Sequence, residues 1–496
     1  MPWHGQMTSK KVIDSAPDGD ALGGARWLNG QAVGVVPVTR EQRAAAGRAV
    51  RQLVPRSSHG EWSPDPQRPD PVELLQEQAS TRIQELVPLR YGRMLRTPFT
   101  FYRGAAYLMA SDLAGSPRTG LTTQLCGDAH LSNFGSFAAP DRRLLFGLND
   151  FDETLPGPFE WDLKRLATSF AVAGRDRGFG SGTRESINLA VTRAYRRTML
   201  EMAQLGRLDL WYARLDVDEV GERLRALLKP REVKQFERTV AKARAKDRTK
   251  AFAKLVEVVD GQPKFVGDPP RMVPLDQMFA VEEHQRVWEV LSEMLDSYRR
   301  SLNGDRRHLF EGFHFVEAAL KVVGVGSVGT RAWVVLMVGN GVDDPLFLQV
   351  KEAQSSVLEP FLGKNEHASH GQRVVEGQRL MQSASDILLG WIRADGLDGV
   401  SRDYYVRQLW DGKGSADVES MKPAGMRGYA DLCGWTLARA HARSGDPVAI
   451  AGYLGSGDRF DRALASFAET YADQNERDFA ALEHAAKTGR IETESD

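Results

Sequence analysis

The strongest constraint on the fold is one β-hairpin pattern in a chain whose remaining sequence mostly has helical character. A glycine-rich run at 322–329 leads into the apolar run 332–338, a turn rich in Gly and Asp covers 340–344, and a second apolar run covers 346–351. Apolar, β-branched runs of this length predict strands, and glycine permits the tight backbone conformations that strand connections require. We therefore expect a glycine-hinged antiparallel β unit.

Most of the remaining chain has the spacing of helices. Apolar residues recur at helical intervals from 161 to about 202, residues 214–310 continue mostly as helix, and further helices are expected at 428–443 and 459–487. The predicted fold class is α+β, with a small antiparallel β lobe and a large helical lobe. Residues 1–75 are rich in Gly, Pro, Arg and Ser, which predicts a flexible N-terminal arm.

Composition limits the location and the partners. The chain has 496 residues, a formal net charge of −1 and two cysteines. This charge gives no sign of nucleic-acid binding, and the lack of a membrane-length apolar run and of a signal-peptide pattern predicts a cytoplasmic protein without a membrane partner. The basic stretch 234–254 is interpreted as a solvated helix face, and a substrate- or phosphate-facing role stays open. The sequence gives no indication of the oligomeric state.

A polar segment between two predicted strands carries the first candidate catalytic residues. Asp128 and Asn133 have the spacing D-x-x-x-x-N after the strand run 121–126, and Asp150 ends the next strand run. Phosphoryl transfer from ATP needs a carboxylate near the acceptor hydroxyl and oxygen ligands for Mg²⁺. We assign Asp128 to the acceptor, and Asn133 and Asp150 to the metal. His130 is a candidate base or metal ligand, although a role in organising the loop is preferred.

The glycine-rich run has the pattern G-x-G-x-x-G. A dinucleotide-binding fold would place a helix after this pattern, whereas a strand run follows it here. The pattern is therefore predicted to cover the phosphates of a nucleotide. The residues assigned to this role are Gly324, Gly326, Ser327 and Gly329.

Lys351 ends the second strand of the hairpin, where it would supply a fixed cation to the α- and β-phosphates. A carboxylate from a neighbouring helix is expected to hold this lysine. Glu376 is the preferred partner, and Glu366 and Glu359 remain alternatives.

The strand run 404–409 follows the predicted helix after Lys351. Its end is expected to meet the adenine of a bound nucleotide through backbone atoms. Leu409 or Trp410 is the candidate for lining the adenine pocket.

These segments resemble parts of known phosphotransferases. Cys126-Gly-Asp-Ala-His-Leu-Ser-Asn133 is similar to the H-G-D-x-H-x-x-N loop of aminoglycoside phosphotransferases and choline kinases, which are small-molecule relatives of protein kinases. Cys126 replaces the first histidine of that motif. Residues 149–152 resemble the metal-binding D-F-G position, and Gln349-Val-Lys351 resembles the V-A-I-K strand. The resemblance implies that Asp162 is a structural acid that ties a helix to the backbone of the catalytic loop.

The order of these parts differs from that of kinases. Kinases run from glycine loop and lysine through the hinge to the catalytic loop and metal aspartate, whereas this chain begins with the last two parts. The order indicates a circular permutation, which is tolerated where chain ends can lie close together. The predicted units are a flexible arm at 1–75, a helical C-lobe with the catalytic and metal loops at 76–312, a nucleotide-binding β-rich N-lobe at 313–412, and helices returning to the C-lobe at 413–496.

Over roughly residues 40–480 the chain also resembles a bacterial family catalogued as domain of unknown function 2252, from which no activity follows. The resemblance rests on the segments 125–135, 149–154, 158–166 and 372–378. The predicted function is an ATP- and Mg²⁺-dependent kinase-like phosphotransferase acting on a hydroxyl substrate, with a slight preference for a small molecule. Nucleotidyl (AMP) transfer on the same fold and an inactive nucleotide-binding scaffold remain alternatives. The expected partners are a nucleotide and an acceptor substrate.

Overall fold

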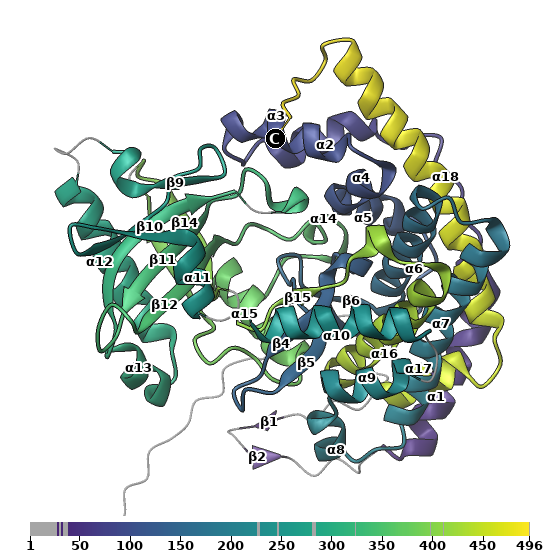
Figure 1. Ribbon diagram of the computed structural model, residues 1–496. Helices are drawn as coiled ribbons and strands as arrows, with labels where there is room; N and C mark the ends of the chain where they lie inside the picture. Colours follow the sequence, from purple (N-terminus) through teal and green to yellow (C-terminus); the bar gives the residue numbers. More distant parts are fainter. Residues whose placement is uncertain are drawn as a thin grey trace, which may run out of the picture.

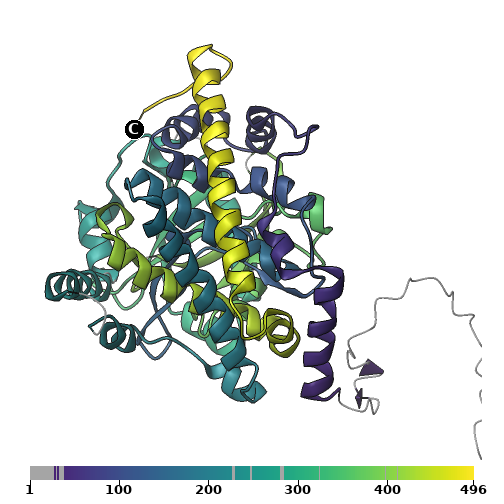
Figure 2. The same ribbon diagram turned by 90° about the vertical axis from the view of Figure 1, so that its right-hand side faces the viewer.

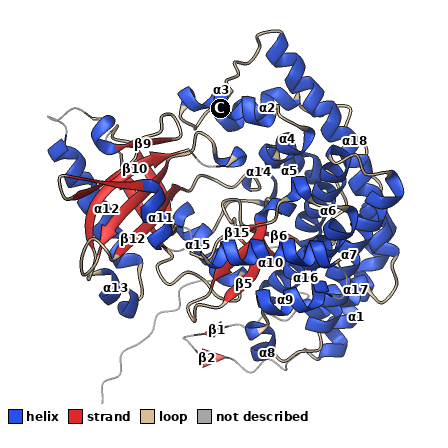
Figure 3. Cartoon of the chain, viewed as in Figure 1, coloured by secondary structure: helices blue, strands red, loops and turns tan. Residues whose placement is uncertain are grey.

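A mixed architecture of helices and antiparallel sheets is confirmed by the computed structural model, in which a β-rich lobe lies beside a larger helical lobe (Figures 1 and 3). The structure describes residues 27–28, 31–32, 38–225, 229–245, 248–279, 284–322, 324–396, 398–409 and 411–495.

Helices account for most of the larger lobe. The described helices are α1 (Arg40–Leu53), α2 (Pro71–Ala79), α3 (Val87–Met94), α4 (Pro98–Gly104), α5 (Ala106–Ala114), α6 (Phe159–Asp176), α7 (Ser181–Met202), α8 (Arg207–Tyr212), α9 (Val217–Arg225), α10 (Pro230–Arg244), α11 (Arg248–Leu255), α12 (His284–Ser301), α13 (Gly304–Phe310), α14 (Glu359–Leu362), α15 (His370–Met381), α16 (Pro423–Ser444), α17 (Pro447–Leu454) and α18 (Arg459–Lys487). The predicted helix 161–202 is two helices, because the chain turns between α6 and α7 at Gly178, whose φ is +67°.

The six-stranded sheet of the β lobe is antiparallel throughout. Its strands, in spatial order, are β13 (Gly390–Asp395), β14 (Ser401–Gln408), β12 (Pro345–Glu352), β11 (Ala332–Val338), β10 (His314–Lys321) and β9 (Met272–Pro274). The expected hairpin is β11 and β12, paired from Ala332 opposite Lys351 to Val338 opposite Pro345. The glycine-rich run connects β10 to β11, so this register brings Lys351 close to the point where that run enters β11.

Successive side chains of a strand point to opposite faces of the sheet. Other elements cover both faces here, so the side chains on both are buried. Val334 and Leu336 of β11 pack with α11 and with β8 (Gln262–Phe265), which pairs with β7 (Val256–Val259). Val335 and Met337 of β11 pack with α12 and α13 on the opposite face.

The β lobe therefore begins earlier than the predicted boundary at residue 313. Elements α11–α13 and β7–β9 belong to it, because β9 pairs with β10 at the sheet edge and α12 lies on β13.

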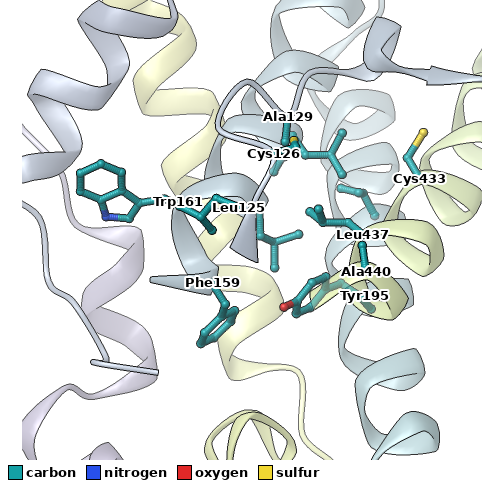
Figure 4. Close-up of a cluster of buried hydrophobic side chains, with 14 of the residues drawn as sticks. Leu125, Cys126, Ala129, Phe159, Trp161, Tyr195, Cys433, Leu437 and Ala440 are labelled. Atoms are coloured by element: carbon teal, nitrogen blue, oxygen red, sulfur yellow. The ribbon is translucent and has the colours of Figure 1, made fainter. Parts of the chain in front are cut away.

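The helical lobe has its core around α6, α7, α16 and α18 (Figure 1). In Figure 4, Leu125 lies between Trp161 and Leu437, and Cys126 lies beside Ala129, within the same buried cluster. The start of the loop that carries Asp128 is therefore set on a rigid, close-packed base.

Residues 40–60 pack on this lobe, although the sequence suggested a flexible arm up to residue 75. Helix α1 lies on α17, where a Cβ at Gly47 would fall 1.9 Å from the Ala449 carbonyl oxygen, so the close approach requires glycine. The short helix η1 (Arg56–Gly60) lies on α18, the long yellow helix of Figure 2. Residues 1–26 of the predicted arm lie outside the described residues, and Trp27–Leu28 pairs with Gln31–Ala32 as β1 and β2.

Short strand pairs position the loops that follow them. Strand β3 (Thr122–Leu125) pairs with β6 (Leu155–Pro158), and β4 (Phe134–Ala138) pairs with β5 (Leu144–Leu148) and with β15 (Gly414–Ser415). The segment with Asp128 joins β3 to β4, and the segment with Asp150 joins β5 to β6. Both segments therefore run between the same two small sheets.

Candidate active site

A cavity of about 550 Å³ lies between the sheet of the β lobe and the loops of the helical lobe. It brings together most of the residues selected from the sequence. The predicted residues that line it are Asp128, His130, Asn133, Asp150, Gly324, Gly326, Ser327, Lys351 and Leu409. Gly329 and Glu376 do not line it.

The acidic loop, residues 127–133, is held through its backbone. Asp162 of α6 accepts hydrogen bonds from the backbone N–H groups of Cys126 (2.7 Å) and Gly127 (3.0 Å). His441 of α16 lies 3.3 Å from the same carboxylate through Nε2. The structural role predicted for Asp162 is thereby confirmed.

Gly127 must be glycine at the start of this loop. Its φ is +83°, and a Cβ would lie 2.3 Å from the Glu153 carbonyl oxygen. The loop thus packs directly against the segment that carries Asp150.

Asp128 is partly buried and lies beside a cation. Arg165 of α6 donates from Nε to Asp128 Oδ1 at 2.5 Å. Burial raises the pKa of Asp128, and Arg165 and Arg103 oppose that rise. The carboxylate is fixed in place by Arg165, while burial increases its affinity for a proton above that of an ordinary aspartate.

His130 organises the loop. Its Nδ1 accepts the Ser132 backbone N–H at 3.2 Å, which caps the short helix η3 (Leu131–Asn133). Burial, together with Arg103 and Arg165, lowers the pKa of His130 well below its ordinary value. The bond from the Ser132 N–H to His130 Nδ1 fits the loop-organising interpretation.

Asn133 and Asp150 supply the oxygen atoms suited to a hard cation. Asn133 Nδ2 donates to the Asp128 carbonyl at 2.6 Å, so its amide oxygen is the atom left for a ligand. Burial and Asp152 raise the pKa of Asp150, whereas Lys351 and Arg407 lower it.

These two residues fit Mg²⁺ only as part of its coordination shell. Across the described chain, no group of three or more His, Cys, Asp or Glu side chains is arranged to hold a metal ion. Mg²⁺ commonly takes one or two protein oxygens and completes its shell with phosphate oxygens and water. The pair is therefore compatible with Mg²⁺ that arrives with a polyphosphate.

Lys351 is held by Asp152, and the predicted pair with Glu376 is not formed. The Lys351 ammonium donates to Asp152 Oδ2, and Tyr405 of β14 donates to Oδ1 of the same carboxylate at 2.7 Å. Glu376 lies 3.0 Å from Arg379 on its own helix. Helix α15 presents Glu376 away from the lysine, and a carboxylate of the helical lobe takes its place.

The alternative partners are placed elsewhere as well. Glu366 is exposed, and Glu359 lies 3.6 Å from His370. Burial would lower the pKa of Lys351, but Asp152, Tyr405 and Asp150 raise it, so the amine stays charged. Burial raises the pKa of Asp152, yet Lys351 and Tyr405 bring it below its ordinary value.

The glycine segment, residues 324–329, is attached to the helical lobe. Arg82 Nη1 donates to the Val328 carbonyl at 2.6 Å, and the Ile83 N–H donates to the Gly329 carbonyl at 2.8 Å. Val325 is buried in a cluster with residues of α2–α5 and α18. This segment of the β lobe therefore takes its position from the opposite lobe.

The end of β14 closes the far side of the cavity. Leu409 lines it, and its N–H donates to the Phe347 carbonyl at 2.9 Å. Arg407 donates to Gln349 Oε1 (3.1 Å) and to the Asn149 carbonyl (3.0 Å), and so links the sheet to the segment that carries Asp150. Trp410 lies outside the described residues.

Several residues of this site have no signal in a local pattern. Arg165 lies in the segment 158–166 and Asp152 in the segment 149–152. The sequence patterns assign roles only to their neighbours Asp162 and Asp150. Arg103 and Arg407 come from α4 and β14, and their presence at the cavity depends on the tertiary fold.

The basic stretch 234–254 has the solvated character that was preferred for it. Lys234, Arg238, Lys242 and Lys254 are exposed, and Arg244 lies 2.5 Å from Asp218. No helix among the described residues is long and apolar enough to cross a membrane.

Fold and site together define a two-lobed α+β protein whose interlobe cavity combines carboxylates, an asparagine, a buried lysine and a glycine-rich segment. The chain belongs to the DUF2252 family, described as an uncharacterized protein conserved in bacteria, whose model matches residues 82–485. No curated protein and no solved structure matches the chain.

Proposed function

We propose that this protein is an ATP- and Mg²⁺-dependent phosphotransferase with a circularly permuted, kinase-like arrangement of parts. The observation that supports it is the meeting of two distant segments across one cavity. Lys351 of the hairpin bonds to Asp152, and the Asp152 N–H donates to Asp150 at 3.3 Å. A phosphate group beside that lysine lies within reach of the same carboxylates.

The proposed chemistry is transfer of the terminal phosphoryl group of ATP to a hydroxyl. The acceptor oxygen forms a bond to the γ-phosphorus while the bond to the β–γ bridging oxygen breaks, which releases ADP. Asp128 orients the hydroxyl and accepts its proton, and Arg165 keeps the carboxylate in position. The raised affinity of the partly buried Asp128 for a proton favours this step.

Asn133 and Asp150 would bind Mg²⁺, which neutralises the charge of the β- and γ-phosphates when bound. Lys351 places a permanent cation on the opposite side of the polyphosphate, with Asp152 and Tyr405 fixing its amine. The glycine segment is suited to cover the phosphates, because glycine lets backbone N–H groups approach an anion closely.

The contact between α16 and β3 supports the permuted arrangement. Gln124 N–H of β3 donates to Ser444 Oγ at the end of α16 (3.0 Å), and a Cβ at Gly445 would lie 2.8 Å from the Thr122 carbonyl oxygen. Helix α16 resembles the kinase helix that leads directly into the catalytic loop. Here the two elements meet in space although 320 residues separate them along the chain.

The experiment is a measurement of Mg²⁺-dependent ATP consumption across metabolite and protein pools. Wild type is compared with Asp128→Asn and with Asp260→Asn, a control in an exposed turn whose φ of 51° asparagine tolerates. We expect Asp128→Asn to lower turnover by about 100-fold or more and Asp260→Asn to leave it unchanged. Equal turnover in Asp128→Asn and wild type would remove Asp128 from the mechanism.

The mass of the product separates the proposal from its alternative. Addition of one phosphoryl group supports phosphotransfer, and addition of a whole nucleotidyl group replaces it with AMP transfer. Nucleotide binding without turnover in any pool, unaltered by Asp150→Asn, would instead identify a binding scaffold.

A further inference from the structure

Arg103 is a cation at the cavity that the order of motifs does not include. It lies in the last turn of α4 and lines the cavity together with Asp128, Asp150 and the glycine segment. Its Nη2 is 3.9 Å from the position that a Cβ on Gly324 would occupy, and its carbonyl oxygen is 3.3 Å from the corresponding position on Gly326. The guanidinium is thus next to the segment assigned to the phosphates.

Arg103 differs from three cations at or next to the cavity that have fixed protein partners. Arg165 is bonded to Asp128, Lys351 to Asp152, and Arg407 to Gln349 and Asn149. The Nε of Arg103 is buried and has no hydrogen-bond partner within the described part of the chain. A buried donor of this kind has an energetic cost that a ligand can remove.

The position of Arg103 is set before any ligand binds. Helix α4 begins with a capping box at Thr97, and Arg90 of α3 donates to the Gly104 carbonyl at 2.9 Å, directly after Arg103. Asn475 of α18 donates to the Pro98 carbonyl at 3.0 Å. Because its own capping box and two neighbouring helices hold α4 at both ends, the guanidinium stem leaves from a rigid base.

The charges around Arg103 indicate what the guanidinium does. Asp128 and Asp150 are close enough to favour its charged form, while burial lowers its pKa, yet neither carboxylate bonds to it. A guanidinium presents several donors in one plane, which suits the oxygens of a phosphate better than a single carboxylate at a distance.

We propose that Arg103 binds the terminal phosphate of the nucleotide, from the side of the helical lobe and opposite Lys351. The inference rests on the proposed function and adds to it a phosphate-binding residue supplied by a helix that precedes the acidic loop. Lys351 and Arg103 then hold the polyphosphate from both lobes, and Arg103 is the donor that senses the γ-phosphate.

The test is the affinity of the full-length protein for Mg·ATP, Mg·ADP and AMP, measured by titration calorimetry. The variants are Arg103→Gln and Arg103→Lys. The matched control is Arg193→Gln, which removes one positive charge from an exposed position on α7. Thermal unfolding of each variant reports whether the fold is retained.

We expect Arg103→Gln to weaken Mg·ATP binding by about 10-fold or more, as for loss of a hydrogen bond to a charged group. AMP binding should change less than about 2-fold, so the preference for ATP over AMP falls. Arg103→Lys should recover part of the ATP affinity because it keeps the charge but not the planar fork. Arg193→Gln should behave as wild type.

Three results would overturn the inference. One is unchanged ATP affinity in Arg103→Gln. Another is an equal loss for ATP, ADP and AMP without recovery in Arg103→Lys, which would identify a structural residue. A wild-type protein that binds no nucleotide would reject the proposed function itself, and the inference with it.

Discussion

The acidic loop and the glycine segment face each other across one cavity, but they are anchored differently. The acidic loop is held by its own lobe: Asp162 and Ser169 of α6 accept its N–H groups, and Tyr429 of α16 donates to the Leu131 carbonyl at 2.7 Å. The glycine segment belongs to the β lobe, yet Arg82 and Ile83 of the helical lobe bind its carbonyls.

The difference shows how the two lobes are coupled. A loop fixed by its own lobe keeps its geometry whatever the other lobe does, whereas a segment fixed by the opposite lobe links the spacing of the lobes to its own shape. The cavity thus has one rigid wall and one wall that depends on contacts between lobes. Substitutions that cut either set of contacts test this distinction.

The largest effect should come from removing the anchor of the acidic loop. Asp162→Ala leaves two buried N–H groups without an acceptor, which we expect to lower the free energy of unfolding by about 4 kcal/mol. Urea denaturation measures the change. Asp296→Ala, at an exposed site on α12, should stay within about 0.5 kcal/mol, and a similarly small change for Asp162→Ala would contradict the assigned role.

Breaking the ion pair that joins the lobes should cause the second-largest loss of unfolding free energy. Asp152→Asn leaves the buried Lys351 without a charged partner, for an expected loss of about 3 kcal/mol in unfolding free energy. Glu376→Gln removes the carboxylate that the sequence favoured, and its cost should be below about 0.5 kcal/mol because it affects only a partly exposed pair. Equal losses for both substitutions, again in urea, would restore Glu376 as a partner.

Glu153 adds a pH-dependent link between the segment that carries Asp150 and the segment after β12. Its carboxylate accepts the Val357 N–H at 2.7 Å, and burial raises its pKa from 4.5 to about 7. The folded state holds this proton more tightly, so the contribution to stability is full below pH 4.5 and is lost as pH rises through about 7.

The difference in unfolding free energy between wild type and Glu153→Gln should therefore change by about 3 kcal/mol between pH 4.5 and 7. The wild type should lose stability relative to the variant as pH increases. Glu85→Gln, at an exposed position, should run parallel to wild type, and a parallel course for Glu153→Gln as well would remove the titration from Glu153.

The smallest effect concerns the anchor of the glycine segment. Arg82→Met removes the bond to the Val328 carbonyl, with an expected cost of about 1 kcal/mol and about 5-fold faster hydrogen exchange at amides 325–330. Exchange in the acidic loop should not change, and Arg193→Met should change neither region. Faster exchange in both loops of Arg82→Met would show that they are not anchored separately.

Sequence patterns gave the elements with strong local character. Strands 144–148 and 332–338 and helix 459–487 are found at the predicted residues, because each has an uninterrupted apolar run or a long helical repeat. Strand β10 was not predicted, since Glu317-Ala-Ala-Leu-Lys321 has helical propensity and becomes a strand only through pairing with β9 and β11. Edge strand β13 was missed because only two of its six residues are buried.

The site was predictable where one segment carries its own chemistry. Asp128, Asn133 and Asp150 stay close in space in any fold that keeps β3, β4 and β5 together. The partner of Lys351 was not predictable in this way, because it depends on how the lobes meet. Helix α15 places Glu376 beside Arg379, and Asp152 approaches from a segment 199 residues away.

The contact between Ser444 and Gln124 has a consequence for how this molecule could be rebuilt. Because the last turn of α16 touches the strand before the acidic loop, a few residues could link the two once the links from α5 to β3 and from α16 to α17 are cut and a new chain end is opened before the β lobe. Which parts are neighbours would then stay the same while the first and last residues changed. For this molecule, the order of the segments along the chain and the geometry of the cavity are separate properties.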